Sequence, residues 1–212
     1  MPYDLYVITD ETLAGGLLHA EIARRAVAGG ADVIQLRDKA LDCHELVRIG
    51  REIRAVTNPA GARFIVNDRL DVALACGADG VHLGQGDISI EVARQLAPPG
   101  FVIGISVGSV DEALAAESAG ADYVALSPTF DTGSKADAGP GHGLNRLRSI
   151  RNAVRIPVIA IGGIGPGNVR EVIHAGADGV AVISAVVSAP DIAKAARDLK
   201  ERIRAAKREA TP

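Results

Sequence analysis

Aromatic residues, cysteines and net charge are all scarce in this sequence, and each shortage excludes a class of protein. Aromatic residues make up 3% of the 212 residues, tryptophan is absent, and the formal net charge is −3. Such a chain offers little for stacking bases and no excess of positive charge for a phosphate backbone, so we expect no nucleic-acid partner. Cys43 and Cys76 form no CxxC pair and fall in segments typical of helices, which argues against a disulfide or a zinc site.

Long hydrophobic runs are also missing. No apolar stretch approaches the roughly 20 residues of a membrane span, and the start MPYDLYVITD lacks the basic region and long apolar stretch of a signal peptide. We therefore expect no membrane association and a cytoplasmic location. The chain is 48% hydrophobic and 23% charged, which is the composition of a compact domain with a sizeable core. Small-molecule chemistry is the function class that remains.

A Gly-Ala-Asp tripeptide occurs four times, beginning at residues 30, 77, 120 and 176. Each copy follows an alanine-rich helical pattern and precedes an apolar strand pattern, so its glycine suits a helix end and a short turn into the strand. Four more strand patterns lie between these copies, at 5–10, 63–67, 101–106 and 157–163, and each is followed by a helix-compatible stretch. The sequence therefore predicts eight βα units.

Eight units in 212 residues leave about 26 residues each, close to the lower size limit of a (β/α)8 barrel. The predicted fold class is α/β, a single TIM barrel over residues 1–212. A doubly wound open sheet is the alternative, but no glycine fingerprint follows the first strand, where VITDETLAGG stands. A final helix at about 190–207 would close the ring, with an apolar face made of Ile192, Ala196, Leu199 and Ile203.

Polar residues gather at the C-terminal ends of the predicted strands, where barrels of this kind carry their chemistry. Alternation in ADVIQLRDK, residues 31–39, places Gln35, Arg37 and Lys39 on one face and turns Ile34 and Leu36 toward the helices. A ligand that reaches from Gln35 to Lys39 would be long and anionic. Later strands end in further polar side chains: Asn67, Asp68, His82, Gln85, Asp87 and Ser106.

Asp68 and Asp87, at neighbouring strand ends, match the usual protein ligands of magnesium, which takes one or two carboxylates beside water and phosphate oxygens. Each also has a simpler interpretation, Asp68 as a helix N-cap and Asp87 as a loop cap. Beside Arg37, Lys39 and Asn67, the pair predicts a diphosphate site in which metal and cations share the negative charge. The histidines show no metal-ligand spacing; His82 is the one expected to line the mouth, with packing as its favoured role.

A run of turn-forming residues, SPTFDTGSKADAGPGHG at 127–143, follows the sixth strand. A loop of this length in a compact barrel is typical of a lid or a binding loop. Thr132, Ser134 and Lys135 give it hydroxyl and ammonium donors, and an ordinary exposed lysine is the alternative for Lys135.

The seventh and eighth strands end in IGGIGPGN and VISAVV, where Gly162, Gly163 and the amides near Ile183 and Ser184 would face a phosphate. The loops after these two strands form the recurrent phosphate site of the fold. Tight turns are the alternative role for the glycines. The barrel mouth is thus predicted to hold two anion sites on opposite sides.

Together these segments resemble the thiamine-phosphate synthase family, which joins a pyrimidine methyl diphosphate to a thiazole phosphate. The resemblance covers most of the chain and rests on QLRDK at 35–39, ND at 67–68, GVHLGQGD at 80–87, GISVG at 104–108, TGSK at 132–135, IGGI at 161–164 and VISA at 182–185. It implies a magnesium-dependent transferase whose partners are these two small-molecule substrates. The implied reaction is a dissociative displacement that releases diphosphate.

The resemblance also implies roles for individual residues. The pyrimidine diphosphate would be held by Gln35, Leu36, Arg37, Asp38, Lys39, Asn67, Ser106 and Lys135. Magnesium would be held by Asp68 and Asp87. The thiazole phosphate would be held by Thr132, Gly133, Ser134, Gly163, Ile183 and Ser184. Arg37, Lys39 and Lys135 would be catalytic, because they stabilise the departing diphosphate. Ser127 and Ser134 stand where the family pattern has glycine and threonine, so the preferred thiazole is left open.

Two alternatives stay open at this point. A sister branch isomerises the thiazole phosphate and carries a histidine at the start of the long loop, where this chain has Pro128. A non-catalytic protein that binds a thiamine precursor as a regulator would have no reason to combine Asp68, Asp87, Arg37 and Lys39. The sequence also leaves open whether the chain forms a homodimer and whether it associates with a pyrimidine kinase.

Overall fold

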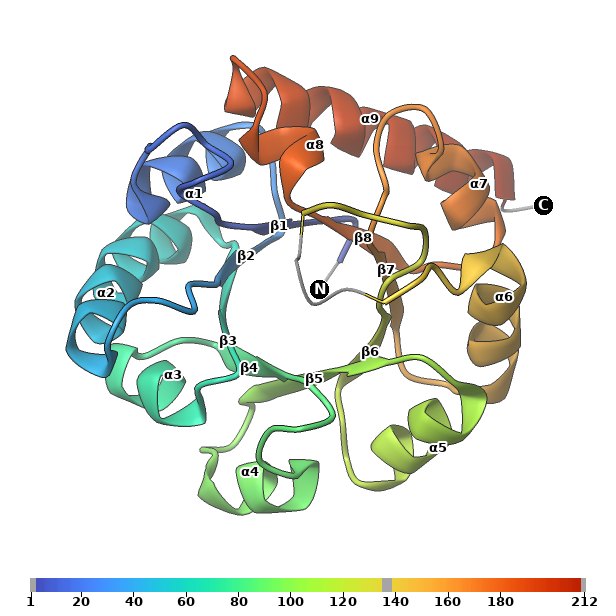
Figure 1. Ribbon diagram of the computed structural model, residues 1–212, viewed down its shortest axis with the longest axis horizontal. Coiled ribbons are helices and arrows are strands. Elements are labelled where there is room, and N and C mark those ends of the chain that lie inside the picture. The colour runs from blue at the N-terminus through green and yellow to red at the C-terminus, as the bar shows by residue number, and fades with distance from the viewer. Residues whose placement is uncertain (1–2, 135–138, 211–212) are drawn as a thin grey trace.

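Eight parallel strands close into a single barrel in the computed structural model, which describes residues 3–134 and 139–210. The strands follow one another around the ring in chain order, and β8 (Gly179–Val182) pairs with β1 (Leu5–Ile8) to close it (Figure 1). The helices surround this ring on its outer side. The barrel prediction is confirmed, and the open-sheet alternative is wrong.

The predicted alternation of strands and helices is present throughout. The other strands are β2 (Val33–Leu36), β3 (Arg63–Asn67), β4 (Gly80–Leu83), β5 (Val102–Val107), β6 (Tyr123–Leu126) and β7 (Val158–Ile161). The helices are α1 (His19–Ala28), α2 (Cys43–Ala60), α3 (Leu70–Cys76), α4 (Ile90–Leu96), α5 (Val110–Ser118), α6 (Gly143–Ala153), α7 (Val169–His174), α8 (Ser184–Val187) and α9 (Ile192–Ala210).

Each Gly-Ala-Asp copy forms the turn from a helix into an even-numbered strand, and its aspartate accepts a hydrogen bond from the preceding odd-numbered strand. These bonds join Asp32 to the amide of Leu5, Asp79 to Phe64, Asp122 to Ile103 and Asp178 to Val158, at 2.7 to 3.0 Å. The glycine of each copy has a φ between 69° and 101°, the left-handed conformation that ends a helix. The repeat thus builds the N-terminal end of the barrel, opposite the predicted site.

The last helix closes the ring as predicted, since α9 packs against α1, α7 and β1. Its predicted apolar face is buried, with Ala196, Leu199 and Ile203 fully enclosed. Cys43 begins α2 and Cys76 ends α3, and both are free thiols. None of the helices within 3–134 and 139–210 combines the length and apolar composition needed to cross a bilayer.

Candidate active site

A cavity of about 280 Å³ opens at the C-terminal ends of β2 to β5. It collects polar side chains from separate strands, as the sequence predicted. Its lining residues are Arg37, Lys39, Asn67, Asp68, His82, Gly84, Asp87, Ser106, Ser127, Pro128 and Gly139. Two cations, two carboxylates and neutral hydrogen-bonding groups therefore face one small volume, which we call the diphosphate cavity.

The two carboxylates of this cavity lie against each other. Burial and the neighbouring Asp87 carboxylate raise the pKa of Asp68, while Lys39 and Arg37 oppose this shift. The backbone of Asp68 adopts a left-handed conformation, with φ 62°, and its amide donates to the carbonyl of His82 at 2.8 Å. Residues other than glycine adopt this conformation in only a few per cent of cases, aspartate more often than most, and such residues cluster at functional sites. Two adjacent acidic groups at a strained backbone form a place where a cation would relieve repulsion.

The simpler interpretations of these aspartates have different outcomes. Asp68 is not a helix cap, because the residue before α3 is Arg69 and no side chain caps that helix end. The cap of α4 is Ser89, whose side chain accepts from the amide of Val92. Asp87 does act within its own loop, since its carboxylate accepts from the amide of Gly84 at 2.6 Å. The loop-cap interpretation of Asp87 therefore holds together with its place in the cavity.

A chain of hydrogen bonds crosses the barrel interior below the diphosphate cavity. Nε2 of Gln35 donates to Oη of Tyr6 at 2.7 Å, and this hydroxyl lies 3.1 Å from Oη of Tyr123. Nδ1 of His82 lies 2.9 Å from the same Tyr123 hydroxyl, and its Nε2 lies 2.9 Å from Oγ of Ser106. The chain thus begins at a glutamine that is 2% exposed and ends at a serine of the cavity wall.

This chain changes the predicted placement of Gln35. Its side chain does not line the cavity with Arg37 and Lys39 but lies deeper, bonded to Tyr6. Oε1 of Gln35 is buried and has no hydrogen-bond partner among residues 3–134 and 139–210. His82 packs against Tyr123, with ring centroids 5.6 Å apart, yet it also reaches the cavity. The packing role expected for His82 is therefore incomplete.

Both interior tyrosines were missed as candidate residues. Burial raises the pKa of Tyr6 and of Tyr123 well above the ordinary value, so both hydroxyls keep their protons. Strand alternation is the signal that marks Tyr123, because Val124 and Leu126 face the helices and Tyr123 must then face inward. A buried hydroxyl needs a partner, and the barrel interior provides one from another strand.

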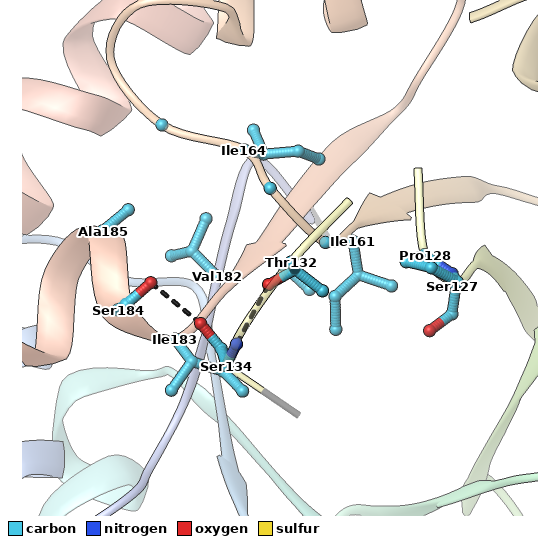
Figure 2. A pocket seen from close by; sticks show the side chains of 14 residues that line it. Ser127, Pro128, Thr132, Ser134, Ile161, Ile164, Val182, Ile183, Ser184 and Ala185 are labelled. Carbon is cyan, nitrogen blue, oxygen red and sulfur yellow. Dashed lines mark hydrogen bonds between the residues drawn. The ribbon is translucent and has the colours of Figure 1, made fainter. Parts of the chain in front are cut away.

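A second cavity, of about 380 Å³, lies beside β7 and β8 and is shown in Figure 2. It brings together Thr132, Ser134, Gly163, Ile183 and Ser184, all predicted to hold the thiazole phosphate. Oγ of Ser134 lies 3.0 Å from Oγ of Ser184, and the amide of Ser134 donates to Oγ1 of Thr132 at 3.2 Å. These contacts hold the loop after β6 against the end of β8. We call this space the thiazole cavity.

The glycines after β7 serve both roles considered for them. Gly162 and Gly163 have φ values of 100° and 65°, so they form the tight turn. They also line the thiazole cavity. A Cβ on Gly162 would lie 2.7 Å from Cβ of Pro128, and one on Gly163 would lie 2.7 Å from the carbonyl oxygen of Asp131. Glycine is therefore needed for the close approach of the long loop as well as for the turn.

The two cavities adjoin at Ser127 and Pro128, which line both of them. One cavity is rich in charged groups, and the other is lined by hydroxyls, glycines and aliphatic side chains. A ligand in each would have its inner end at this shared wall. The histidine expected of the sister branch is replaced by Pro128, and the residues described around the thiazole cavity include no imidazole.

Besides Gln35, four predicted site residues are not among the described residues that line either cavity. Leu36 is 1% exposed and belongs to the core. Asp38 accepts hydrogen bonds from the amides of Ala40 and Leu41. Gly133 is exposed beside the thiazole cavity. Lys135 lies outside the described residues. The roles of these four residues stay predictions.

Comparison with known proteins agrees with this arrangement. A family model described as thiamine monophosphate synthase matches residues 5–186. The chain belongs to this family. A thiamine-phosphate synthase of Methanoregula boonei is 67% identical over 98% of this chain and 96% of its own length, and one of Methanoculleus marisnigri is 63% identical over 99% of each. The resemblance inferred from the motifs is confirmed.

A solved structure extends the agreement to three dimensions. Thiamine phosphate pyrophosphorylase from Pyrococcus furiosus superposes with a TM-score of 0.89, at 46% identity and over 96% of both chains. Membership of the thiamine monophosphate synthase family therefore rests on matching sequence over nearly the whole chain and on a shared barrel.

Proposed function

We propose that this chain is a magnesium-dependent thiamine-phosphate synthase. It joins 4-amino-2-methyl-5-(diphosphooxymethyl)pyrimidine to a thiazole ethyl phosphate, or to its carboxylated form, and releases diphosphate, together with carbon dioxide when the carboxylated form reacts. The observation that supports this most directly is the pair of cavities that share Ser127 and Pro128. An enzyme that joins two phosphorylated substrates needs two neighbouring anion sites, and it needs their reacting ends to meet.

Arg37 and Lys39 supply the positive charge of the diphosphate cavity. Each would donate to the diphosphate, where a charge-assisted hydrogen bond strengthens as the leaving group gains charge. Asn67 and Ser106 add neutral donors to the same wall. We assign Lys135 to the same task on the ground of family resemblance. Departure of diphosphate leaves a pyrimidine methyl cation, which the thiazole nitrogen captures at the shared wall.

Asp68 and Asp87 fit a magnesium ion. Burial and the neighbouring Asp87 carboxylate raise the pKa of Asp68, a cation would offset both effects, and carboxylate oxygens are the ligands that magnesium prefers. In the described part of the chain no group of three acidic, histidine or cysteine side chains forms a closed metal cluster. Magnesium, when bound, would supply positive charge against the diphosphate oxygens. The aspartates would hold that charge beside Arg37 and Lys39.

The thiazole cavity would bind the second phosphate through hydroxyls and backbone amides. Ser134 and Ser184 already contact each other across the cavity entrance, so one anion can meet both hydroxyls. The aliphatic side chains of Ile161 and Val182 would pack against the ring of the thiazole. The role of Gln35 toward the pyrimidine rests on the family resemblance, because its side chain lies below the diphosphate cavity and does not line it. A cytoplasmic location and a homodimer remain predictions.

A turnover assay with both substrates tests the proposal. We expect thiamine phosphate and diphosphate in equal amounts, with a requirement for magnesium. Asp87→Asn removes one negative ligand and should lower turnover on the order of 10²-fold or more at limiting magnesium. Asp71→Asn is the matched control, because Asp71 is an exposed carboxylate of α3 that pairs with Arg69 outside the cavity.

The alternatives give different outcomes in the same assay. Conversion of thiazole phosphate without the pyrimidine substrate would indicate a tautomerase. Tight binding of both substrates without product would indicate a regulator. Full activity of Asp87→Asn at limiting magnesium would contradict the metal assignment.

A further inference from the structure

His19 is a buried side chain that the proposed mechanism does not use. It is the first residue of α1, and its side chain is 0% exposed. Nδ1 lies 2.7 Å from Oγ1 of Thr9, and Nε2 lies 3.3 Å from a carboxylate oxygen of Asp38. A carboxylate of Glu11 lies 3.8 Å from Nε2. A buried imidazole with partners on both nitrogens is held in one orientation.

The side-chain partners of His19 come from the loops after β1 and β2. Thr9 and Glu11 follow β1, and Asp38 follows β2. Glu11, in the loop between β1 and α1, accepts a hydrogen bond from the amide of His19 at 2.9 Å. This bond satisfies the first amide of α1, which receives no side-chain cap from Leu18. Thr9 follows β1, and its hydroxyl lies 3.2 Å from the carbonyl oxygen of Gln35 in β2. Thr9 therefore connects His19 to both β1 and β2.

In the sequence, Asp38 lies between Arg37 and Lys39, the two cations of the diphosphate cavity. It accepts from the amide of Ala40 at 2.7 Å and from the amide of Leu41 at 3.0 Å. Nε2 of His19 lies 3.3 Å from its other carboxylate oxygen, and a hydrogen on that nitrogen makes it the third donor. Three hydrogen bonds thus determine where this carboxylate lies.

The sheet does not determine the geometry of this segment. β2 ends at Leu36, so the backbone of residues 37–39 continues beyond the barrel ladder. Strand alternation alone therefore does not hold Arg37 and Lys39 toward one cavity. A contact outside the sheet is required, and the bonds of Asp38 provide it.

We propose that His19 is a positioning residue for the diphosphate cavity. Through Asp38 it holds the backbone between Arg37 and Lys39, so that both cations meet one anion. This inference rests on the proposed function, because it takes the diphosphate as the ligand of these two cations. It assigns a role in binding to a residue of α1 that touches neither substrate.

Substitutions that keep or remove the Nε2 donor test this role. In His19→Gln the amide nitrogen takes the place of Nε2 and can still donate to Asp38, whereas the shorter side chain of His19→Asn reaches only toward Thr9. Calorimetric titration of each variant with inorganic diphosphate plus magnesium, and separately with the thiazole phosphate, measures both cavities. His19→Asn should weaken diphosphate binding about 10- to 100-fold, the usual effect of losing an orienting partner.

The conservative variant should recover most of this loss. His19→Gln is expected to bind diphosphate within a few-fold of the parent, and both variants should bind thiazole phosphate as the parent does. Ile22→Ala is the matched control for stability, because Ile22 is fully buried on the same helix and its aliphatic side chain has no group that can hydrogen-bond to Asp38. It should lower the melting temperature and leave both affinities unchanged. Asp38→Asn should reproduce the selective loss of diphosphate binding, and it serves as the second variant if His19→Asn fails to fold.

Three results would overturn the inference. If His19→Asn binds diphosphate as tightly as the parent does, His19 does not position the diphosphate cavity. The same conclusion holds if His19→Asn loses equal affinity for diphosphate and for thiazole phosphate. A loss in Ile22→Ala as large as that in His19→Asn would assign the effect to general stability. Failure of the parent itself to bind diphosphate would overturn the proposed function as well, which separates that failure from the first three.

Discussion

Nε2 of His82 lies 2.9 Å from Oγ of Ser106, and this contact connects the buried interior of the barrel to its diphosphate cavity. One set of hydrogen-bond directions agrees with the Gln35 amide as the donor at the other end of this series of bonds. Gln35 donates to Tyr6, whose hydroxyl hydrogen is then available to Tyr123, and the Tyr123 hydrogen to Nδ1 of His82. In this set Nε2 carries the imidazole hydrogen and donates a hydrogen bond to Oγ of Ser106. The Ser106 hydroxyl keeps its own hydrogen for a ligand in the cavity.

Ser106→Ala should therefore weaken diphosphate binding. A hydrogen bond to a charged group is worth about 1.5 to 3 kcal/mol, which corresponds to roughly 10- to 150-fold in affinity. Ser109→Ala is the control just after the same strand, since Ser109 caps α5 through the amide of Glu112 and does not line the cavity. It should cost about 1 kcal/mol of stability and no affinity. Calorimetric titration with diphosphate and magnesium, beside urea unfolding, separates the two outcomes. Unchanged affinity in Ser106→Ala would contradict the donor role.

Arg37 and Lys39 should show coupled losses. Both line the diphosphate cavity and would meet one anion, so the double alanine variant should differ from the sum of the single losses by on the order of 0.5 kcal/mol or more. Leu36→Met is the control, because Leu36 is buried in the core and a volume-conserving change there affects stability slightly. Titration of each ligand into each variant measures the coupling. Additive losses, or equal damage to thiazole phosphate binding, would mean that the two cations do not share a ligand.

The three tyrosines should stay protonated for as long as the protein is folded. Burial raises the pKa of Tyr3, although Arg63 opposes this shift, and burial raises the pKa of Tyr6 and Tyr123 further. In the unfolded chain these groups titrate near the ordinary value of about 10. The folded state therefore holds more protons above that pH, and stability falls as the pH rises beyond about 10. Tyrosinate absorbance should appear together with the loss of helical circular dichroism. Ionisation near pH 10 with intact helices would contradict this expectation.

The aspartates of the Gly-Ala-Asp repeat should matter for stability and not for turnover. Asp178 accepts from the amide of Val158 at 2.8 Å and pairs with Arg151 at the end of the barrel opposite the cavities. Asp178→Ala leaves a strand amide without its partner, which should cost about 1 to 3 kcal/mol. Chemical unfolding measures this cost, and kcat below the unfolding temperature should equal that of the parent. A large loss of kcat in fully folded protein would place the repeat in the chemistry.

Local rules were sufficient to predict the barrel and much of the diphosphate cavity. The period of two in the strands and the Gly-Ala-Asp turns predict eight βα units because each feature depends on neighbouring residues. In a parallel barrel every strand ends at the same face, so the segments that carry Arg37, Lys39, Asp68 and Asp87 reach that face once the strand ends are known. The predicted convergence of these four side chains agrees with the structure.

Other features depend on contacts that no local pattern contains. Gln35 has the correct face for the mouth, yet a hydroxyl of Tyr6 and a row of partners from β6 and β4 hold it in the interior. Residues joined by these hydrogen bonds are up to 117 positions apart in the sequence. Closure of the barrel brings their strands together, and burial then requires each polar group to find a partner.

The sequence by itself determined the order of the strands, the end of the barrel that carries the chemistry and the charge gathered there, because helix ends, alternation and strand direction are properties of adjacent residues. The tertiary structure alone decided that His19 meets Asp38 and that Ser127 and Pro128 divide two cavities. These contacts depend on how loops from different βα units approach across the mouth, and side-chain distances across a mouth are set by packing and not by sequence spacing.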